Sequence, residues 1–363
     1  MCTGEHPGQR RDPVAGSSPQ STVASMQPDD QEVLDAVAEH TEPTPTPAVV
    51  AAETFRAARE EVAKVIVGQR SLLDRVLIAV VTGGHLLIEG VPGLAKTRTV
   101  KTFAHVLGGS WQRVQFTPDL VPADLTGTRI WTPGENRFVR EIGPVATNFL
   151  LADEINRAPA KVQAALLESM EEHQVTIGRE TIALPDPFVV LATQNPLESE
   201  GTYPLPDAQT DRFMFRVRVD YPTPLEELEI LRRHLVSDHA AERVLDIDAV
   251  LDARRMVRDV YVPKDLAATI VELVDSTRNA GKVEPSLDGM LLCGAGPRGS
   301  LALMTASQGR AFLAGRSEVT VDDVTELAGD VLAHRIVLSY RAHESSLTQT
   351  EAVARLLQRA VGR

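Results

Sequence analysis

The stretch LLIEGVPGLAKTRTV, residues 86–100, constrains the fold of this chain more than any other segment. An apolar run typical of a buried strand leads into a glycine-containing turn and then into a helix. The turn follows the phosphate-binding formula G-x-x-x-x-G-K-[ST] at Gly90, Lys96 and Thr97, but Ala95 stands where the formula has its second glycine. We therefore predict a phosphate-binding loop, and the alternative is an ordinary strand, turn and helix with a surface lysine.

Ala95 does not exclude this prediction. The formula favours glycine because backbone N–H groups must wrap around the phosphates. Gly93 still supplies a freely bending residue, and alanine has the smallest possible Cβ, so a left-handed Ala95 would cost about 1–2 kcal/mol. Lys96 is expected to reach the β- and γ-phosphates and Thr97 to hold Mg²⁺. The residues predicted to surround the phosphates are Gly90, Val91, Pro92, Gly93, Leu94, Ala95, Lys96, Thr97 and Arg98.

Three further apolar runs, separated by segments of helical pattern, predict buried strands: WQRVQF (111–116), NFLLAD (148–153) and FVVLAT (188–193). Strands that alternate with helices are typical of a parallel sheet with helices on both faces, which binds ligands at the carboxyl ends of its strands. From about Pro222 the pattern is almost entirely helical, and TVDD (320–323) predicts a capping box. The predicted fold class is α/β, followed by a smaller all-helical lid.

Composition divides the chain into three parts. Residues 1–48 are rich in Pro, Ser and Thr and carry eight Asp or Glu against two Arg. They are predicted to be a disordered acidic tail, within which DDQEVLDAVAEH has the pattern of a short helix. Residues 49–221 are the predicted nucleotide-binding α/β domain, and residues 222–363 are the predicted helical lid domain. With 363 residues, 43% of them hydrophobic, the chain can fill a sizeable core.

Charge and cysteine content argue against several classes of protein. The formal net charge of −13 disfavours a large nonspecific nucleic-acid surface, although an acidic body can still enclose a basic pore. Cys2 and Cys293 are the only cysteines, which is too few for a disulfide framework and indicates a reducing, cytoplasmic setting. No apolar run approaches the ~20 residues of a membrane span, and the N-terminal sequence lacks the apolar region of an export signal.

The run NFLLAD leads into an acidic pair, Asp153 and Glu154, at the carboxyl end of a predicted strand. In a parallel sheet this end lies beside the phosphate loop. Asp153 is suited to hold Mg²⁺ through its water shell, and Glu154 is suited to polarise the attacking water as general base. The alternative is an acidic pair that favours the positive end of a helix dipole. The presence of Lys96 and Thr97 favours the catalytic interpretation.

The run FVVLATQNP brings Asn195 to the same edge of the predicted sheet. Its neutral amide could there hydrogen-bond the γ-phosphate or orient the attacking water. An Asn-Pro turn is the alternative, since such turns are common. The expected position of this strand beside the acidic pair favours the functional role.

Four segments together resemble the MoxR-type AAA+ ATPases: GVPGLAKT, LLADEINRAPAKVQAALLESMEEHQVTIG, VLATQNPLESEGTYPLPDAQTDRF and GPRGSLAL. The resemblance covers nearly the whole chain from about residue 52. Alanine is common at the second loop glycine in that family, so the resemblance implies that Ala95 is a normal variant. It also implies hydrolysis of ATP with Mg²⁺ by a ring, expected to be a hexamer. Such a ring remodels or matures a protein complex, acting on protein clients and often with a partner that carries a von Willebrand factor A domain.

The resemblance assigns roles to three further polar residues. Asn195 corresponds to the sensor 1 position. Arg212, in DRF, corresponds to the arginine finger, which reaches the ATP of the neighbouring subunit and spreads positive charge over the transition state. Arg298, in GPRGS, corresponds to sensor 2, which reaches the γ-phosphate from the lid. Without these motifs, a surface ion pair is the expected role of Arg212 and a solvated first-turn position that of Arg298.

Two segments are similar to binding elements of the family. VIVGQ (65–69) resembles the segment that contacts adenine, which implies that Val67 and Gly68 bind the base. Residues 126–148 resemble an inserted hairpin that lines the pore of the ring and touches substrate, and IWTPGENRFV within them has two β-rich arms around a turn. Trp131 and Phe138 are expected to pack across this hairpin rather than to form a nucleobase platform.

Two other residues are interpreted as structural. His85 is expected to serve in packing or at the surface, and Cys293 to be a small core residue. Two other functions compete with ATP-driven remodelling. A switch or scaffold that holds ATP without turnover is disfavoured by the presence of Glu154 and Arg212. A nucleic-acid motor is disfavoured by the charge and by the lack of an obvious DNA-binding module.

Overall fold

The computed structural model describes residues 47–91, 93–134, 136–196, 202–236 and 240–362. Pro92 and nearly all of the predicted acidic tail lie outside these residues. The last two residues of the tail range open the first described helix, α2 (Pro47–Val65). No described helix is both long enough and apolar enough to cross a lipid bilayer.

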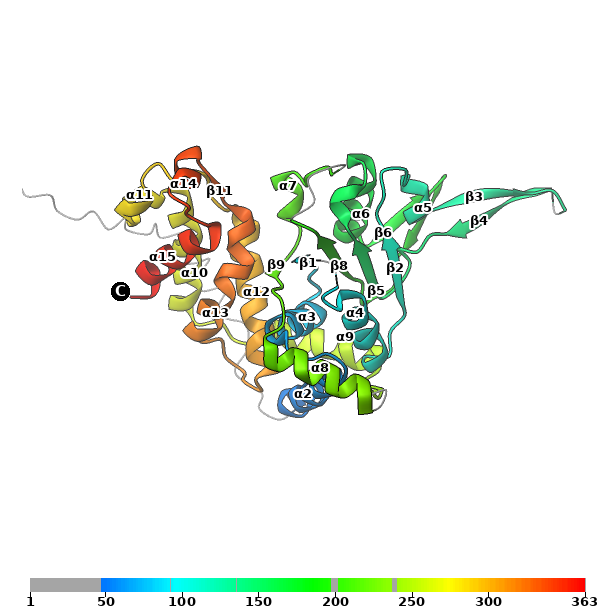
Figure 1. Ribbon diagram of the computed structural model, residues 1–363, viewed down its shortest axis with the longest axis horizontal. Helices are drawn as coiled ribbons and strands as arrows, with labels where there is room; N and C mark the ends of the chain where they lie inside the picture. The colour runs from blue at the N-terminus through cyan, green and yellow to red at the C-terminus, as the bar shows by residue number, and fades with distance from the viewer. Residues whose placement is uncertain (1–46, 92, 135, 197–201, 237–239, 363) are drawn as a thin grey trace, which may run out of the picture.

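Five parallel strands form the central sheet, in the order β2, β5, β8, β1, β9 (Figure 1). Their bounds are β1 Leu86–Glu89, β2 Trp111–Gln115, β5 Phe149–Asp153, β8 Val189–Gln194 and β9 Phe215–Arg218. All four predicted apolar runs are strands of this sheet, which confirms the fold class. Strand β9 was not predicted, because its four residues FRVR alternate apolar and charged side chains and so form no continuous apolar run.

Helices cover both faces of the sheet, because successive strand residues point to opposite sides. The helices in this part of the chain are α3 Arg70–Thr82, α4 Lys96–Val106, α5 Pro122–Thr126, α6 Ala160–Glu172 and the short α7 Asp207–Thr210. In β1, Leu86 and Ile88 belong to one hydrophobic core with α2, α3 and α4. Leu87 belongs to a second core with α6. The two cores hold the parallel strands side by side, so their carboxyl ends lie along one edge of the sheet.

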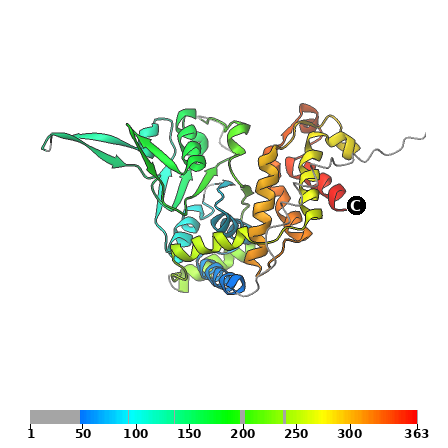
Figure 2. The same cartoon turned by 180° about the vertical axis from the view of Figure 1, so that it is seen from behind.

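The C-terminal part of the chain is mostly helical. Its elements are α8 Pro224–Val236, α9 Ile247–Arg258, α10 Lys264–Arg278, α11 Ala280–Val283, β10 Leu291–Cys293, α12 Pro297–Leu313, α13 Val321–Leu332, β11 Val337–Leu338, α14 Tyr340–Glu344 and α15 Gln349–Val361. The predicted capping box is confirmed, since Thr320 and Asp323 cap the start of α13. Helices α10 to α15 gather on one side of the molecule, whereas α8 and α9 lie near α2 and α3 (Figure 1, Figure 2). The domain boundary at residue 222 stays a prediction.

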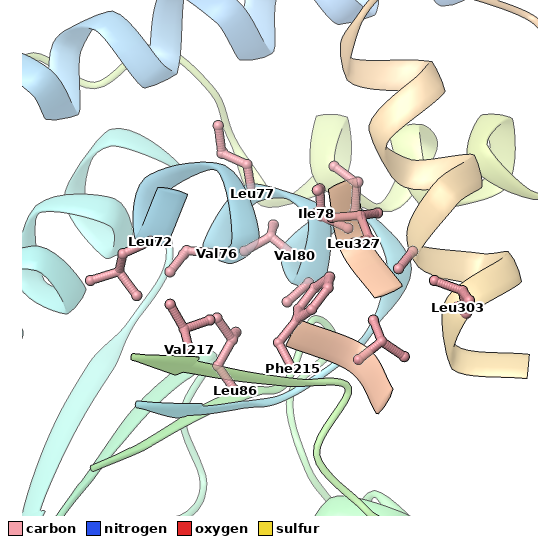
Figure 3. Packing of buried hydrophobic residues seen from close by; sticks show 14 of the residues in the cluster. Leu72, Val76, Leu77, Ile78, Val80, Leu86, Phe215, Val217, Leu303 and Leu327 are labelled. Carbon is pink, nitrogen blue, oxygen red and sulfur yellow. The ribbon is translucent and has the colours of Figure 1, made fainter. Parts of the chain in front are cut away.

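Helix α3 joins the sheet to the lid helices. Figure 3 shows its apolar face, including Val76, over strands β1 and β9, with Leu327 of α13 entering the same cluster. The Arg75 guanidinium of α3 is buried and forms ion pairs with two carboxylates of α13, Glu326 at 2.9 Å and Asp330 at 2.8 Å. A buried charge is tolerated only when it is paired and hydrogen-bonded, so this contact fixes α13 against α3.

Two antiparallel hairpins extend from the α/β part, β3 Gly127–Thr132 with β4 Arg137–Ile142 and β6 Gln174–Ile177 with β7 Glu180–Ala183. The first confirms the predicted hairpin and projects away from the body in both views (Figure 1, Figure 2). Trp131 lies directly opposite Phe138 with ring centroids 5.0 Å apart, which confirms the expected cross-strand packing. The second hairpin was not predicted.

The predictions of a structural role for Cys293 and for His85 have opposite outcomes. The expectation for Cys293 was wrong: the residue is exposed, because β10 pairs only with the short β11 and turns its last two residues to solvent. His85 is buried and packs, as expected. Its Nδ1 accepts the Val190 N–H at 3.0 Å, so Nε2 carries the proton and faces the Met170 carbonyl at 3.3 Å. His85 therefore ties the starts of β1 and β8 to the end of α6.

Complete burial lowers the pKa of His85 to about 3, and His173 and Arg254 add repulsion. A group whose folded pKa is depressed stabilises the fold above its unfolded pKa, and that stability is lost as pH falls. Wild type should therefore lose about 2 kcal/mol of unfolding free energy between pH 7.5 and pH 5 through this residue. His85→Gln should be less stable at pH 7.5 but should lose less on acidification, measured by urea unfolding at both pH values. Equal pH dependence in the two proteins would contradict this assignment.

Candidate functional site

The phosphate loop leaves the carboxyl end of β1 in a conformation that its small residues allow. Gly90 donates its N–H to the Gln194 carbonyl at 3.2 Å, which ties the loop to the end of β8. A Cβ on Gly90 would lie 2.8 Å from the Val219 carbonyl oxygen, so a side chain there would force the backbone apart. Gly93 has a φ of +88° with open space around it. The loop therefore needs glycine at position 90 for close approach and at position 93 for conformation.

Ala95 is left-handed, with φ 55° and ψ 20°, and α4 begins directly after it at Lys96. The predicted strained conformation is thus present, and the loop closes with alanine in place of glycine. The Lys96 Nζ donates to the Gly90 carbonyl, so the ammonium lies over the loop. Partial burial lowers the pKa of Lys96, while the charges of Asp153 and Glu154 act in the opposite direction.

Thr193 of β8 organises the acidic pair. Its hydroxyl donates to Asp153 Oδ1 at 2.6 Å and accepts the Glu154 N–H at 2.9 Å. The β5–β8 register explains this contact, because Ala152 lies opposite Ala192 and the next residues along each strand are Asp153 and Thr193. Glu154 has a left-handed φ of 58°, which ends the strand. One hydroxyl therefore fixes the Asp153 carboxylate and the turn that carries Glu154.

Strand β2 supplies a second layer of contacts to the two acids. Arg113 forms an ion pair with Asp153 Oδ2 at 2.7 Å, and it also donates to Gln115 Oε1 at 2.6 Å. The Gln115 amide donates to Glu154 Oε2 at 2.8 Å, and Arg157 donates to the same oxygen at 2.9 Å. Arg113 and Gln115 lie two residues apart, so both side chains point to one face of the strand. The carboxylate of Glu154 is thereby held in one orientation.

Asn195 is buried directly after β8, between the end of β5 and the end of β1. The structure thus brings Lys96, Asp153, Glu154 and Asn195 to one edge of the sheet. The sequence predicted this arrangement from parallel-sheet geometry. Thr97 lies in the first turn of α4 at the same edge, next to Lys96.

A cavity of about 610 Å³ adjoins the phosphate loop, between the end of α2 and helix α8. Its lining includes Val67, Gly93, Leu94, Ala95 and Arg98. Gly68 has a φ of +69°, a conformation that favours glycine, and it lies against the Glu226 side chain of α8. Val67 therefore lies where the adenine-contacting segment was expected.

Gln69 connects this cavity to the loop. Its Nε2 donates to the Leu94 carbonyl at 3.0 Å, while its Oε1 is buried with no partner among the described residues. Gln69 also lines the cavity. A buried acceptor without a donor costs free energy, so it fits a ligand that offers an N–H group, as the amino group of adenine does.

The oxygen atoms at the loop suit Mg²⁺ shared with phosphates. Asp153 offers a carboxylate and Thr97 a hydroxyl, and Mg²⁺ in nucleotide sites is usually bound by one or two such groups together with substrate phosphates and water. In the part of the chain that the structure describes, no cluster of three His, Cys, Asp or Glu side chains forms a metal site by itself. The donor set therefore fits a metal that arrives with the nucleotide.

Arg212 and Arg298 lie elsewhere, at the opposite edge of the sheet. Arg212 precedes β9, and its Nε donates to Glu171 Oε2 at 2.7 Å. Arg298, at the start of α12, forms an ion pair with the other oxygen of Glu171. These hydrogen bonds and charges lower the pKa of Glu171. The three side chains line a cavity of about 280 Å³ together with His85, which precedes β1.

This position changes the expectation for Arg298. The phosphate loop follows β1 and His85 precedes it, so the two cavities are separated by the length of the strand, roughly 16 Å at 3.3 Å per residue. The structure therefore does not bring Arg298 to the phosphate loop of its own chain, as a sensor reaching down from its own lid would require. It lies instead beside Arg212, the residue predicted to act on a neighbouring subunit.

The segment that carries Arg212 is fixed by a buried arginine. Arg335 donates to Asp211 Oδ1 at 2.9 Å and to the carbonyls of Asp211 at 3.0 Å and Phe213 at 2.8 Å. Burial lowers the pKa of Arg335 to about 10, which leaves it charged at neutral pH. Arg335 thus fastens both neighbours of Arg212 while leaving the Arg212 side chain partly exposed.

Sequence reasoning missed several residues of these two sites: Gln69, Arg113, Gln115, Glu171, Thr193 and Arg335. Gln69 directly follows the two residues predicted to contact adenine, so a hydrogen-bonding side chain there was a usable signal. The contacts of Thr193 and Gln115 with the acidic pair span 39 or 40 positions. No local spacing marks such partners, because only the strand order brings them together.

Comparisons with known proteins agree with the geometry. The chain matches the model of the ATPase family associated with various cellular activities (AAA) over residues 85–215 and that of the AAA lid domain over residues 288–356. It is 46% identical to Chaperone MoxR1 of Mycobacterium tuberculosis over 84% of this chain and 81% of that protein. It is 32% identical to Protein MoxR of Methylorubrum extorquens, over 77% and 86%. A crystal structure of a proposed ATPase from Cytophaga hutchinsonii has a TM-score of 0.81 at 42% identity, covering 86% of this chain and 96% of that one.

Substitutions at Ala95 test whether the loop tolerates any side chain larger than a methyl group. Ala95→Gly removes the strain of a left-handed alanine, and we expect unchanged or slightly higher stability, by at most about 1 kcal/mol, with a nucleotide Kd within three-fold of wild type. Ala95→Val adds a β-branched side chain at φ 55°, and we expect a Kd at least about ten-fold weaker. Calorimetric titration with a nonhydrolysable ATP analogue measures both. A tight-binding valine variant would contradict the geometry.

Thr193→Val tests the hydroxyl that fixes the acidic pair. The change keeps the volume but removes the hydrogen bonds to Asp153 and Glu154. We expect kcat for nucleotide hydrolysis to fall about ten-fold or more, with the Kd for nucleotide changed less than three-fold, because the phosphate loop is untouched. Thr193→Ser retains the hydroxyl and is the matched control. Equal activity of the valine and serine variants would remove Thr193 from this positioning role.

Proposed function

Because the chain belongs to the MoxR family of AAA+ ATPases, we propose that it hydrolyses Mg·ATP and uses the energy to remodel or mature a protein complex. The observation that carries the proposal is the convergence of Lys96, Asp153 and Glu154 at one sheet edge beside a cavity large enough for a nucleoside. Each of these groups has a separate task in phosphoryl transfer.

The loop binds the triphosphate. Its backbone N–H groups and the Lys96 ammonium face the phosphate oxygens, and the Gly90 carbonyl that Lys96 now contacts is exchanged for phosphate. The base lies in the cavity against Val67, where Gln69 Oε1 accepts its amino N–H. Thr97 and Asp153 would hold Mg²⁺, which supplies neutralisation of charge on the phosphate oxygens.

Glu154 is the general base. Its carboxylate accepts a proton from water as the water oxygen bonds to the γ-phosphorus and the bond to the β-phosphate oxygen breaks. Gln115 and Arg157 hold one carboxylate oxygen, which leaves the other for the water. Asn195 orients the γ-phosphate or the water from its buried position directly after β8.

Hydrolysis is completed by a second copy of the chain. Arg212 and Arg298 lie at the far edge of the sheet from their own phosphate loop, so both are available only to a neighbour's nucleotide. Two guanidinium groups from the next subunit would then stabilise the transition-state charge, an effect worth about 10³–10⁵ in rate where a single finger has been measured. A ring, which we propose to be a hexamer, satisfies this requirement at every site.

The work of the ring is proposed to be done on protein. One relative carries the name chaperone, and the projecting β3–β4 hairpin presents exposed Trp131 and Phe138 side chains to a client. The proposal also includes a partner with a von Willebrand factor A domain, which rests on the family resemblance. It includes a cytoplasmic setting, which rests on the low cysteine content.

Glu154→Gln tests the proposal most directly. The amide cannot accept the water proton, so phosphate release should fall at least about 100-fold while the Kd for ATP stays within three-fold of wild type. Phosphate release and ATP titration are measured on the same preparation. Glu344→Gln, an exposed carboxylate on α14, is the matched control and should leave both unchanged. Full turnover by Glu154→Gln would remove Glu154 from its role, and absence of turnover in wild type under all assembly conditions would favour a nucleotide-binding scaffold.

A further inference from the structure

The carboxylate of Asp153 makes hydrogen bonds through both of its oxygens, one to each neighbouring strand. Its Oδ1 accepts the Thr193 hydroxyl of β8 at 2.6 Å. Its Oδ2 accepts two N–H groups of Arg113 on β2, Nε at 3.1 Å and Nη2 at 2.7 Å. A carboxylate oxygen has two lone pairs, so the guanidinium of Arg113 uses both acceptor sites of Oδ2.

Arg113 reaches Asp153 along the sheet rather than straight across it. The β2–β5 register places Gln115 opposite Asp153 and Arg113 opposite Leu151. Two residues of a strand span about 6.6 Å, so the long arginine side chain extends by that length toward the carboxyl edge. Its Nη2 also donates to Gln115 Oε1 at 2.6 Å, which holds the guanidinium in this position. The arginine thus brings a positive charge to the carboxylate that is proposed to serve Mg²⁺.

A guanidinium and Mg²⁺ compete for such a carboxylate. Arginine stays protonated in proteins, so its charge cannot be removed to make room for the metal. The repulsion between two cations a few ångströms apart is poorly screened in a partly buried site, and the Asp153 side chain is only 17% exposed. Water molecules bound to Mg²⁺ also need acceptor sites on the carboxylate, and Arg113 uses those of Oδ2. The guanidinium and the metal therefore cannot share this oxygen.

The two partners of Asp153 differ in how easily they can move. Strand β2 is the edge strand of the sheet (Figure 1), and the Arg113 side chain is 45% exposed. Its guanidinium can turn into solvent without repacking a core. Thr193 is buried and belongs to the inner strand β8. Its hydroxyl can therefore hold Asp153 in place after Arg113 has left.

We propose that Arg113 is a competitor of Mg²⁺ within the nucleotide site: its guanidinium binds Asp153 in the absence of metal and leaves when Mg²⁺ arrives with the nucleotide. The inference rests on the proposed function, because it assumes that Asp153 serves the metal. Arg113 is a positioning residue, since it acts through Asp153. It balances the charge of Asp153 between turnovers and lowers the affinity for magnesium-bound nucleotide. That group of ligands includes the product Mg·ADP, which must leave before the next turnover.

Arg113→Met tests the competition, because it removes the charge and keeps much of the length of the side chain. Calorimetric titration with a nonhydrolysable ATP analogue is carried out once with Mg²⁺ and once with EDTA. The Kd with Mg²⁺ should be at least about three-fold tighter than in wild type, since the metal no longer has to break an ion pair. The Kd with EDTA should be unchanged or weaker. Mg·ADP should also bind at least about three-fold more tightly.

Arg255→Met is the matched control, because Arg255 is an exposed arginine that pairs with Asp252 on α9. Its Kd values should stay within about two-fold of wild type under both conditions. A purely structural role of Arg113 predicts that Arg113→Met weakens binding or leaves it unchanged with Mg²⁺ as well as with EDTA. Either result overturns the proposal. Arg113→Gln takes the place of Arg113→Met if the latter fails to bind the analogue.

A second background separates competition at Asp153 from a general effect of positive charge. In Asp153→Asn the guanidinium has no carboxylate to hold. Adding Arg113→Met to this variant should therefore change the Kd with Mg²⁺ less than about two-fold. If the double variant still gains three-fold over Asp153→Asn, Arg113 acts through long-range charge and the proposed contact is wrong.

A crystal structure of the wild-type protein with Mg²⁺ and the same analogue tests the movement directly. The Arg113 guanidinium should lie away from Asp153 Oδ2, and an intact ion pair beside bound Mg²⁺ overturns the proposal. None of these measurements requires hydrolysis. Normal phosphate release by wild type with an unchanged Kd in Arg113→Met would reject only the competition. Tighter binding by Arg113→Met with no phosphate release by wild type would uphold the competition and reject the ATPase function.

Discussion

The parallel register of β5, β8 and β1 is the constraint on which the nucleotide site depends. It places Thr193 opposite the Asp153–Glu154 turn and brings the phosphate loop to the end of β8 through the bond between Gly90 and Gln194. A shift of one strand by one residue would turn each of these side chains to the other face. Apolar residues on both faces of the strands prevent such a shift, because each face is buried in its own core. The packing of the two cores therefore fixes the positions of the polar side chains at the ends of the strands.

Backbone strain is concentrated at the same site. Three non-glycine residues with left-handed φ surround the loop and the acidic turn: Gln69 at 52°, Ala95 at 55° and Glu154 at 58°. Each such conformation costs of order 1 kcal/mol or more and persists only where the surroundings determine it. Here the surroundings are hydrogen bonds, from Gln69 to the Leu94 carbonyl and from the Glu154 N–H to Thr193.

The sheet also separates the two groups of residues that the proposed mechanism uses. The loop and the acidic pair lie at the carboxyl edge, and Arg212 and Arg298 lie at the amino edge, paired to Glu171. The structure therefore does not bring the two arginines to the phosphate loop of their own chain. In an isolated copy Arg212 forms the surface ion pair that was its ordinary interpretation, and Arg298, for which a solvated first-turn position was the alternative, pairs with the same Glu171. In the proposed mechanism, assembly is the step that turns a nucleotide-binding site into a hydrolytic one.

The α/β class could be predicted from the sequence alone, and so could the positions of the phosphate loop, the acidic pair and Asn195 at the ends of strands, because these features depend on local backbone geometry and on periodicity that short segments carry. The sequence did not reveal Thr193 and Gln115 as partners of the acids, the place of Arg298 beside Arg212, or the outward leucines of α8. The sequence of α8 predicts an ordinary amphipathic helix, because periodicity identifies the apolar side of a helix but not what packs against it. These points are visible only in the folded chain, because they depend on contacts between segments far apart in the sequence, and those contacts are set by strand order and packing.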